Sequence, residues 1–347
     1  MREILRLKPN PYRIVVGNPM KQDHQKTLKR EITRHTSALG RVLDRHPQWS
    51  AILLLSLLVF SWSIPARADF PIDVQQKEAE GDYYNAMLAF ERMPKRIATT
   101  EAVIAAAQSA WALSLPERAI GEYEKALNDK SLPDVERARI EFARGAIELQ
   151  EGNAQVAIVF AERAIARLAQ PSPLRGKLWL LWAESLMRLN SAGAAEDKYI
   201  LAQKEVGEED RPEADYLTAH CQLRLGHTQA AIDNFARIPL EHGRTPEAIR
   251  ALAALSLKAG DYTQASFWLE TGRSKFPERF LDSWVDYALL TVAAREKNIE
   301  KVQEIRSGAE GKYPPSDPWL TLLQAKAESV LWENRQSAGG RNVSHAQ

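Results

Sequence analysis

Four residues in the middle of the chain have side chains that do chemistry in many enzymes: His220, Cys221, His227 and His242. A Cys beside a His suggests a thiol nucleophile or a metal site. Adjacent residues on a helix point about 100° apart, so His220 and Cys221 do not face each other. A corner predicted at Gly226 separates His220 from His227. We therefore interpret Cys221 as a structural residue and the histidines as surface residues.

Other signatures of catalysis are missing from the sequence. It has no glycine-rich phosphate loop, no His-Glu-x-x-His helix and no nucleophile elbow. Cys221 is the only cysteine, which excludes an intramolecular disulfide and a cysteine-based metal cage. We therefore expect a protein without enzymatic activity, cofactor or metal.

The charge of the chain is unevenly distributed. The 347 residues are 45% hydrophobic and 26% charged, as in soluble globular proteins. The net charge is +1, but residues 1–68 hold 12 Lys and Arg against 4 Asp and Glu. The remainder holds 34 basic and 41 acidic residues, a net charge of −7. Such an acidic body is unsuited to nucleic acid, because that affinity comes largely from neutralising phosphates.

The N-terminal part has the layout of an export signal. A basic tail at 1–50 precedes the segment 51–68, in which 14 uncharged, mostly apolar residues end before Pro65. Ala66 and Ala68 then precede Asp69 with the spacing of a cleavage site. Two interpretations remain open, a cleaved signal of a periplasmic protein or a single uncleaved anchor in the inner membrane. The apolar run is shorter than the roughly 20 residues of a spanning helix, which favours cleavage.

Small residues recur through the rest of the chain at the spacing of a helical array. We call them anchors, and they follow one another at steps of 33, 38, 38, 36, 34 and 37 residues. Mostly large apolar residues follow four positions later and mostly small ones seven positions later, so all three lie on one helix face. The anchors are Ala86, Ala119, Ala157, Ala195, Ala231, Ala265 and Val302.

A second set of small residues gives the pattern its identity. Twelve positions before five of the anchors lie Ala107, Gly145, Ala183, Ala219 and Ala253. With Trp179 and Pro277, this order of aromatic, small and closing residues resembles the tetratricopeptide repeat family. The resemblance implies an all-α, right-handed α-solenoid of helix-turn-helix units. We expect about seven repeats over 73–315, a capping helix over 317–335 and a disordered tail over 336–347.

The same resemblance implies that the first helix of each pair lines a concave groove. Just before four successive corners lie cations that recur with the repeat and suit an acidic peptide or a free carboxylate. Helix dipoles alone also favour cations there. The predicted groove residues are the cations Arg188, Arg224, Lys258 and Arg295 and the aromatics Trp111, Phe142, Tyr216, Trp284 and Tyr287.

Export and architecture together suggest a function. We expect a scaffold or adaptor in a bacterial cell envelope that binds a protein or peptide partner in the groove and touches a membrane only through its N-terminal segment. The alternatives are an inner-membrane-anchored adaptor with a cytoplasmic basic tail and a helical domain associated with a cell-wall enzyme. The sequence does not specify the partner or the oligomeric state.

Overall fold

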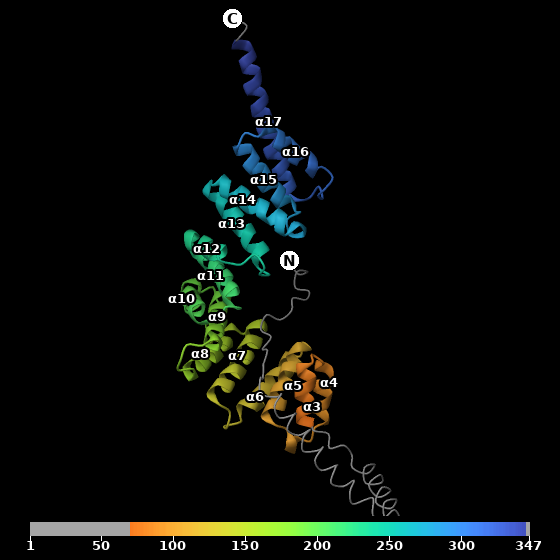
Figure 1. The fold of residues 1–347 in the computed structure, drawn as a ribbon, viewed down its shortest axis with the longest axis vertical. Helices are drawn as coiled ribbons and strands as arrows, with labels where there is room; N and C mark the ends of the chain where they lie inside the picture. Colours follow the sequence, from red (N-terminus) through yellow and green to blue (C-terminus); the bar gives the residue numbers. More distant parts are fainter. Residues whose placement is uncertain (1–69, 345–347) are drawn as a thin grey trace, which may run out of the picture. The chain divides into compact units, whose positions relative to one another are not determined.

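The computed structural model describes residues 70–344, and all its regular elements over that range are helices (Figure 1). Contacts divide the chain into two compact units, Met1–Pro133 and Asp134–Gln347. The described part of the first unit contains α3 (Phe70–Ala79), α4 (Tyr83–Arg92), η1 (Lys95–Ile97), α5 (Thr100–Ala112) and α6 (Pro116–Leu127). The second contains α7 (Asp134–Gln150), α8 (Ala154–Arg167), α9 (Pro173–Arg188), α10 (Ala192–Glu205), α11 (Arg211–Leu225), α12 (Thr228–Ala236), α13 (Thr245–Ala259), α14 (Tyr262–Lys275), η2 (Pro277–Arg279), α15 (Ser283–Arg295), α16 (Ile299–Ala309) and α17 (Pro318–Ser344).

The α-helices pack in consecutive hairpins. In the first unit α3 packs on α4 and α5 on α6. In the second unit five hairpins, from α7–α8 to α15–α16, are followed by α17, which packs on α15 and α16. The described residues thus form seven helical pairs and one further helix.

The predicted anchors occupy the helix contacts. Each of the seven lies in the second helix of a pair and is 0% exposed. The residues seven positions later are buried as well, from Met93 to Ala309. Four positions after the anchors lie large buried side chains such as Tyr199 and Phe235, each worth about 1.5–3 kcal/mol of burial. The last hairpin departs from this rule, since Arg306 is only half-buried.

The corners of the hairpins share one backbone conformation. A residue with positive φ follows each first helix, and in four corners it is a glycine, as at Gly226 and Gly260 with φ of 79° and 77°. In the remaining corners Ser114, Asn190 and Lys297 adopt φ of 59°, 59° and 56°. These three corners have no glycine signal, and the spacing of the anchors locates them instead.

A close approach fixes the start of α9. A methyl group added to Gly176 would lie 2.7 Å from the carbonyl carbon of Glu205 and 2.8 Å from Cα of Val206. Both of these atoms belong to backbone at the end of α10. The first turn of α9 and the last turn of α10 therefore pack backbone to backbone, and only glycine permits this.

The helix α17 begins where the sequence predicts a capping helix. Asp317 accepts hydrogen bonds from the backbone N–H groups of Trp319 and Leu320, at 2.8 and 3.2 Å. The expected disorder from 336 onward is wrong for 336–344, because α17 continues to Ser344. Once a packed segment has nucleated a helix, each further residue adds a hydrogen bond at little cost, so polar residues extend it.

The N-terminal predictions concern residues outside the described part. The basic tail 1–50, the segment 51–68 and the cleavage site at Ala66, Ala68 and Asp69 stay predictions. Among the helices over 70–344, no segment combines the length and the hydropathy that a membrane crossing requires.

Candidate partner-binding face

One side of the first helices α9, α11, α13 and α15 carries most of the predicted site residues. Positions 18, 15, 11 and 7 before the anchor of each of these four hairpins are spaced 3, 4 and 4 apart, which places them on one helix face. All of them except Leu180 are at least partly exposed. We call them the first-helix face: Lys177, Leu180, Glu184 and Arg188 in α9, Glu213, Tyr216, His220 and Arg224 in α11, Glu247, Arg250, Ala254 and Lys258 in α13, and Trp284, Tyr287, Thr291 and Arg295 in α15.

The charges at the N-terminal ends of these helices are paired. In α9, α11 and α13 one charged residue near the N-terminal end contacts an opposite charge just before the next first helix. Each pair joins two successive hairpins, so we call these contacts the hairpin clamps. They are Lys177–Asp210 at 3.0 Å, Glu213–Arg244 at 2.8 Å and Glu247–Arg279 at 2.7 Å.

The clamp at Arg244 is the most elaborate. Its Nε and Nη2 donate to both carboxylate oxygens of Glu213, at 3.0 and 2.8 Å, in the paired geometry that suits a guanidinium. Hydrogen bonding to Glu213 raises the pKa of Arg244. The guanidinium also lies over the half-buried Tyr216 ring, 4.9 Å from its centre. Tyr216 is therefore held in place and keeps one part of its ring at the surface.

His220 extends this cluster along α11. Its ring contacts Tyr216 and Phe235 edge to face, with centre distances of 4.5 and 5.2 Å. Burial by these rings, and then the charge of Arg244, lowers the pKa of His220. The ring is therefore mainly neutral at neutral pH.

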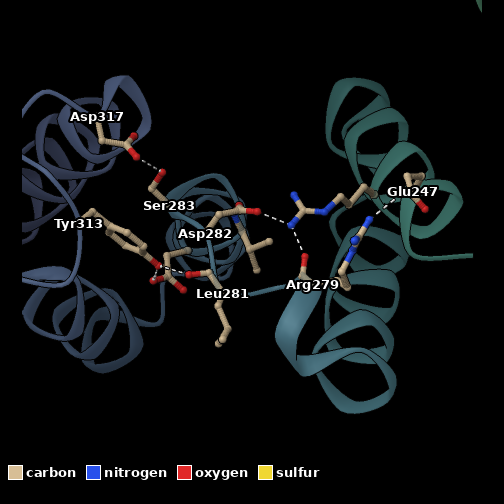
Figure 2. A network of polar contacts seen from close by, with 10 residues as sticks. Glu247, Arg279, Leu281, Asp282, Ser283, Tyr313 and Asp317 are labelled. Carbon is tan, nitrogen blue, oxygen red and sulfur yellow. Dashed lines mark hydrogen bonds and ion pairs between the residues drawn. The ribbon is translucent and has the colours of Figure 1, made fainter. Parts of the chain in front are cut away.

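At the start of α15 a further polar network joins α13 to the following helices (Figure 2). Arg250 donates to the carboxylate of Asp282 and to the carbonyl of Arg279. Its guanidinium lies 4.8 Å from the centre of the Phe280 ring and 5.4 Å from that of Trp284. Trp284 is thereby packed beneath a cation and only half-exposed.

The network continues towards α17. Ser283 donates to Asp317 at 2.8 Å, and the Tyr313 hydroxyl lies 3.0 Å from the carbonyl of Leu281 and 2.6 Å from Asp286 (Figure 2). Lys312 donates to Asp286 at 2.9 Å. Burial, followed by the hydrogen bond to Asp286, raises the pKa of Tyr313 to about 12, so the hydroxyl remains protonated.

The C-terminal ends of the first helices are different. Arg188, Arg224, Lys258 and Arg295 are all exposed there. Arg224 donates to Asn190 in the preceding corner at 3.1 Å, and Arg295 lies 5.6 Å from the centre of the Tyr262 ring. Over the residues that the structure describes, no carboxylate pairs with any of these four cations.

The predicted aromatics fall into three groups. Tyr216, Trp284 and Tyr287 are half-buried on the first-helix face, and Tyr287 packs against Trp319 of α17 with ring centres 5.3 Å apart. Phe142 does not fit the prediction of an open groove residue, because only 2% of it is exposed. Trp111 is half-buried in α5 of the first unit.

The Cys and His residues have separate partners. Cys221 is buried and donates to the carbonyl of Ala192 at 3.3 Å. Burial raises the pKa of its thiol to about 11, which disfavours a reactive thiolate. His227 contacts Glu196 at 3.1 Å, and His242 accepts a hydrogen bond from the Arg244 backbone at 3.3 Å. Cys221 and His220 thus have different neighbours, as their adjacent positions on a helix predict.

The hairpin clamps were not predicted from the sequence. A signal for them exists, since opposite charges recur 33, 31 and 32 positions apart, close to the repeat itself. The sign changes between Lys177–Asp210 and Glu213–Arg244, so a search for one recurring residue type does not find them.

Comparison with known proteins gives matches in structure alone. No family model and no curated sequence matches the chain. The apo form of RapI is similar over 83% of this chain and 94% of its own, with a TM-score of 0.56 and 12% identity. PilF of Pseudomonas aeruginosa matches 61% of this chain and 93% of its own, with a TM-score of 0.49 and 15% identity.

A further similar structure is YrrB, described as a TPR protein with an unusual peptide-binding site. It matches 56% of this chain and 92% of its own, with a TM-score of 0.41 and 17% identity. The similarity to RapI extends over most of both chains and shows a shared all-α fold of helical hairpins.

Proposed function

We propose that the protein is a non-enzymatic scaffold that binds an acidic segment of a protein partner along the first-helix face of the second unit. The observation that carries this proposal is the contrast between the two ends of that face. The hairpin clamps neutralise charges at the N-terminal ends of α9, α11 and α13. The cations at the C-terminal ends are exposed and have no carboxylate partner among the described residues.

The chemistry of these cations suits carboxylates. Arg188, Arg224 and Arg295 each offer paired N–H donors, and Lys258 adds a mobile point charge. Because they recur at 36, 34 and 37 residues, an extended acidic chain can meet them in succession. The half-buried rings of Tyr216 and Trp284 supply rigid apolar surface beside this row.

A peptide titration tests the proposal. Fluorescence anisotropy is measured with a labelled Asp/Glu-rich peptide and a neutral Asn/Gln peptide of the same length. We expect binding of the acidic peptide that weakens as salt is added. The variant R188E/R224E/K258E/R295E is expected to weaken it by at least about tenfold.

A control with the same charge change separates local from general electrostatics. K204E/R273E/K275E/K301E reverses four exposed cations on the second helices α10, α14 and α16. We expect it to leave the affinity within about threefold of the wild type. Equal losses in the two variants, or equal affinity for the acidic and neutral peptides, would contradict the proposed face.

We further propose that the protein acts in a bacterial cell envelope after export. The apolar run before Pro65 and the small residues Ala66 and Ala68 support this location. Mass spectrometry of the mature protein tests it, since cleavage leaves Asp69 as the first residue. An intact N-terminus would instead support an inner-membrane anchor with a cytoplasmic basic tail.

A further inference from the structure

The helix α17 packs on α15 and α16 as the first helix of a further hairpin would. Asp317, the N-cap of α17, lies 35 residues after Asp282, the N-cap of α15. At this step the buried Val285, which packs on the preceding hairpin, corresponds to the buried Leu320. The buried Leu290, which packs with residues of α16 and α17, corresponds to Ala325, and Ala325 is exposed. The side of α15 that the following helices cover is thus open in α17.

The open side of α17 has a regular pattern. Leu322, Ala325, Ser329, Trp332 and Gln336 are spaced 3, 4, 3 and 4 apart, the repeat with which helices pair in coiled coils. All five are exposed, and Trp332 is 57% exposed. They lie on the side away from the buried Leu320, Leu323, Ala327 and Leu331. We call these five residues the α17 seam.

The charges beside the seam are complementary to those of a second, antiparallel copy. Lys326 and Glu333 lie on one flank, and Glu328 and Arg335 lie on the other. In an antiparallel pair of identical helices each flank meets the same flank of the partner. One register of this pair then places Lys326 opposite Glu333 and Glu328 opposite Arg335. The two-fold axis of that register lies close to Leu331, near the middle of Pro318–Ser344.

Size and orientation agree with the same register. It places the large Trp332 opposite the small Ser329, so the ring has room between the helices. In a parallel pair, Glu328 would instead face Glu333 across the seam, which is repulsive. Glu328 also pairs with Arg306 of α16, and Lys326 lies 5.7 Å from the centre of the Tyr287 ring, so both flanks are partly ordered before pairing.

We propose that α17 is a dimerisation helix that pairs antiparallel with α17 of a second copy of this chain. The length of α17 supports this occupant. Residues 332–337 are all exposed, beyond the last buried contact at Leu331. In the proposed dimer the N-terminal half of the second α17 packs along this exposed stretch.

Charge exchange tests the proposal. Analytical ultracentrifugation of the full chain across a concentration series is expected to give a monomer–dimer equilibrium. K326E and E333K each place like charges together at two symmetric contacts, and each is expected to weaken the dimer about tenfold. The double variant K326E/E333K restores opposite charges and is expected to return to within about threefold of the wild type.

A charge exchange on α16 and a substitution of Trp332 complete the test. K301E/E304K exchanges the Lys301–Glu304 pair on α16 and is expected to leave the dimer unchanged. Circular dichroism verifies that each variant keeps its helix content. A monomer at every concentration would overturn the proposal, as would a double variant no better than the single ones. W332A provides a second measurement that does not depend on charge, with an expected loss of at least about tenfold.

Discussion

The two ends of the first helices α9, α11 and α13 differ in how they are held. At the N-terminal ends, backbone contact at Gly176 and the hairpin clamps join each helix to its neighbours. At the C-terminal ends, Arg188 and Lys258 are exposed, and helix dipoles favour cations at these positions by only about 0.3–1 kcal/mol. The N-terminal ends thus set the spacing of the hairpins, and the C-terminal ends are available to a partner.

The largest effect on stability is expected from adding a methyl group at the start of α9. Gly176→Ala places Cβ 2.7 Å from the carbonyl carbon of Glu205, and backbone cannot move aside as a side chain does. We expect a loss of about 3 kcal/mol in the free energy of unfolding, measured by urea denaturation. In Gly193→Ala no atom lies within 4 Å of the added methyl group, so that control should lose nothing and gain up to about 1 kcal/mol. Equal stability of the two variants would contradict a locked N-terminal end.

The hairpins themselves could be predicted from the sequence because their signal is local and repeated. Ala157, Ala195 and Ala231 each need a small side chain where two helices touch, and the same need recurs in every hairpin. Corners without glycine, as at Asn190 and Lys297, were located by the same spacing. The positions of the hairpins therefore followed from periodicity, whereas the solenoid was expected from the family resemblance.

The side chains that tie one hairpin to the next could not be predicted in the same way. The partner of Glu213 is Arg244, 31 residues later, and only the packed structure selects it among the many charges nearby. Phe142 occupies the position equivalent to Tyr216 but is 2% exposed, since the neighbours of each hairpin decide which rings are covered. Periodicity gives the position of a residue on its helix, but not its environment.

A smaller effect is expected from opening one hairpin clamp. Arg244→Ala removes two hydrogen bonds to Glu213 and the cation above Tyr216, with an expected loss of about 1–2 kcal/mol. Arg188→Ala, at the exposed end of α9, should change stability by less than about 0.5 kcal/mol. A double-mutant cycle with Glu213→Ala isolates the coupling between the two charges. A cycle with no coupling would show that the clamp is a passive surface pair.

The smallest effect concerns the titration of His220, which lies between the two ends of α11. Burial and the charge of Arg244 lower the pKa of His220, so the folded state favours the neutral ring. The stability from this preference is fully present above the ordinary pKa of about 6.5 and is lost as pH falls through the lowered value. Proton-detected NMR should therefore show His220 titrating below its ordinary pKa, and Arg244→Ala should raise that pKa by removing one of the two causes.

The matched variant Arg188→Ala, in a different hairpin, should leave the pKa of His220 unchanged. If the pKa of His220 were the same in the wild type, Arg244→Ala and Arg188→Ala, the charge of Arg244 would have no effect on His220. The rings around His220 would then be the sole cause of its lowered pKa.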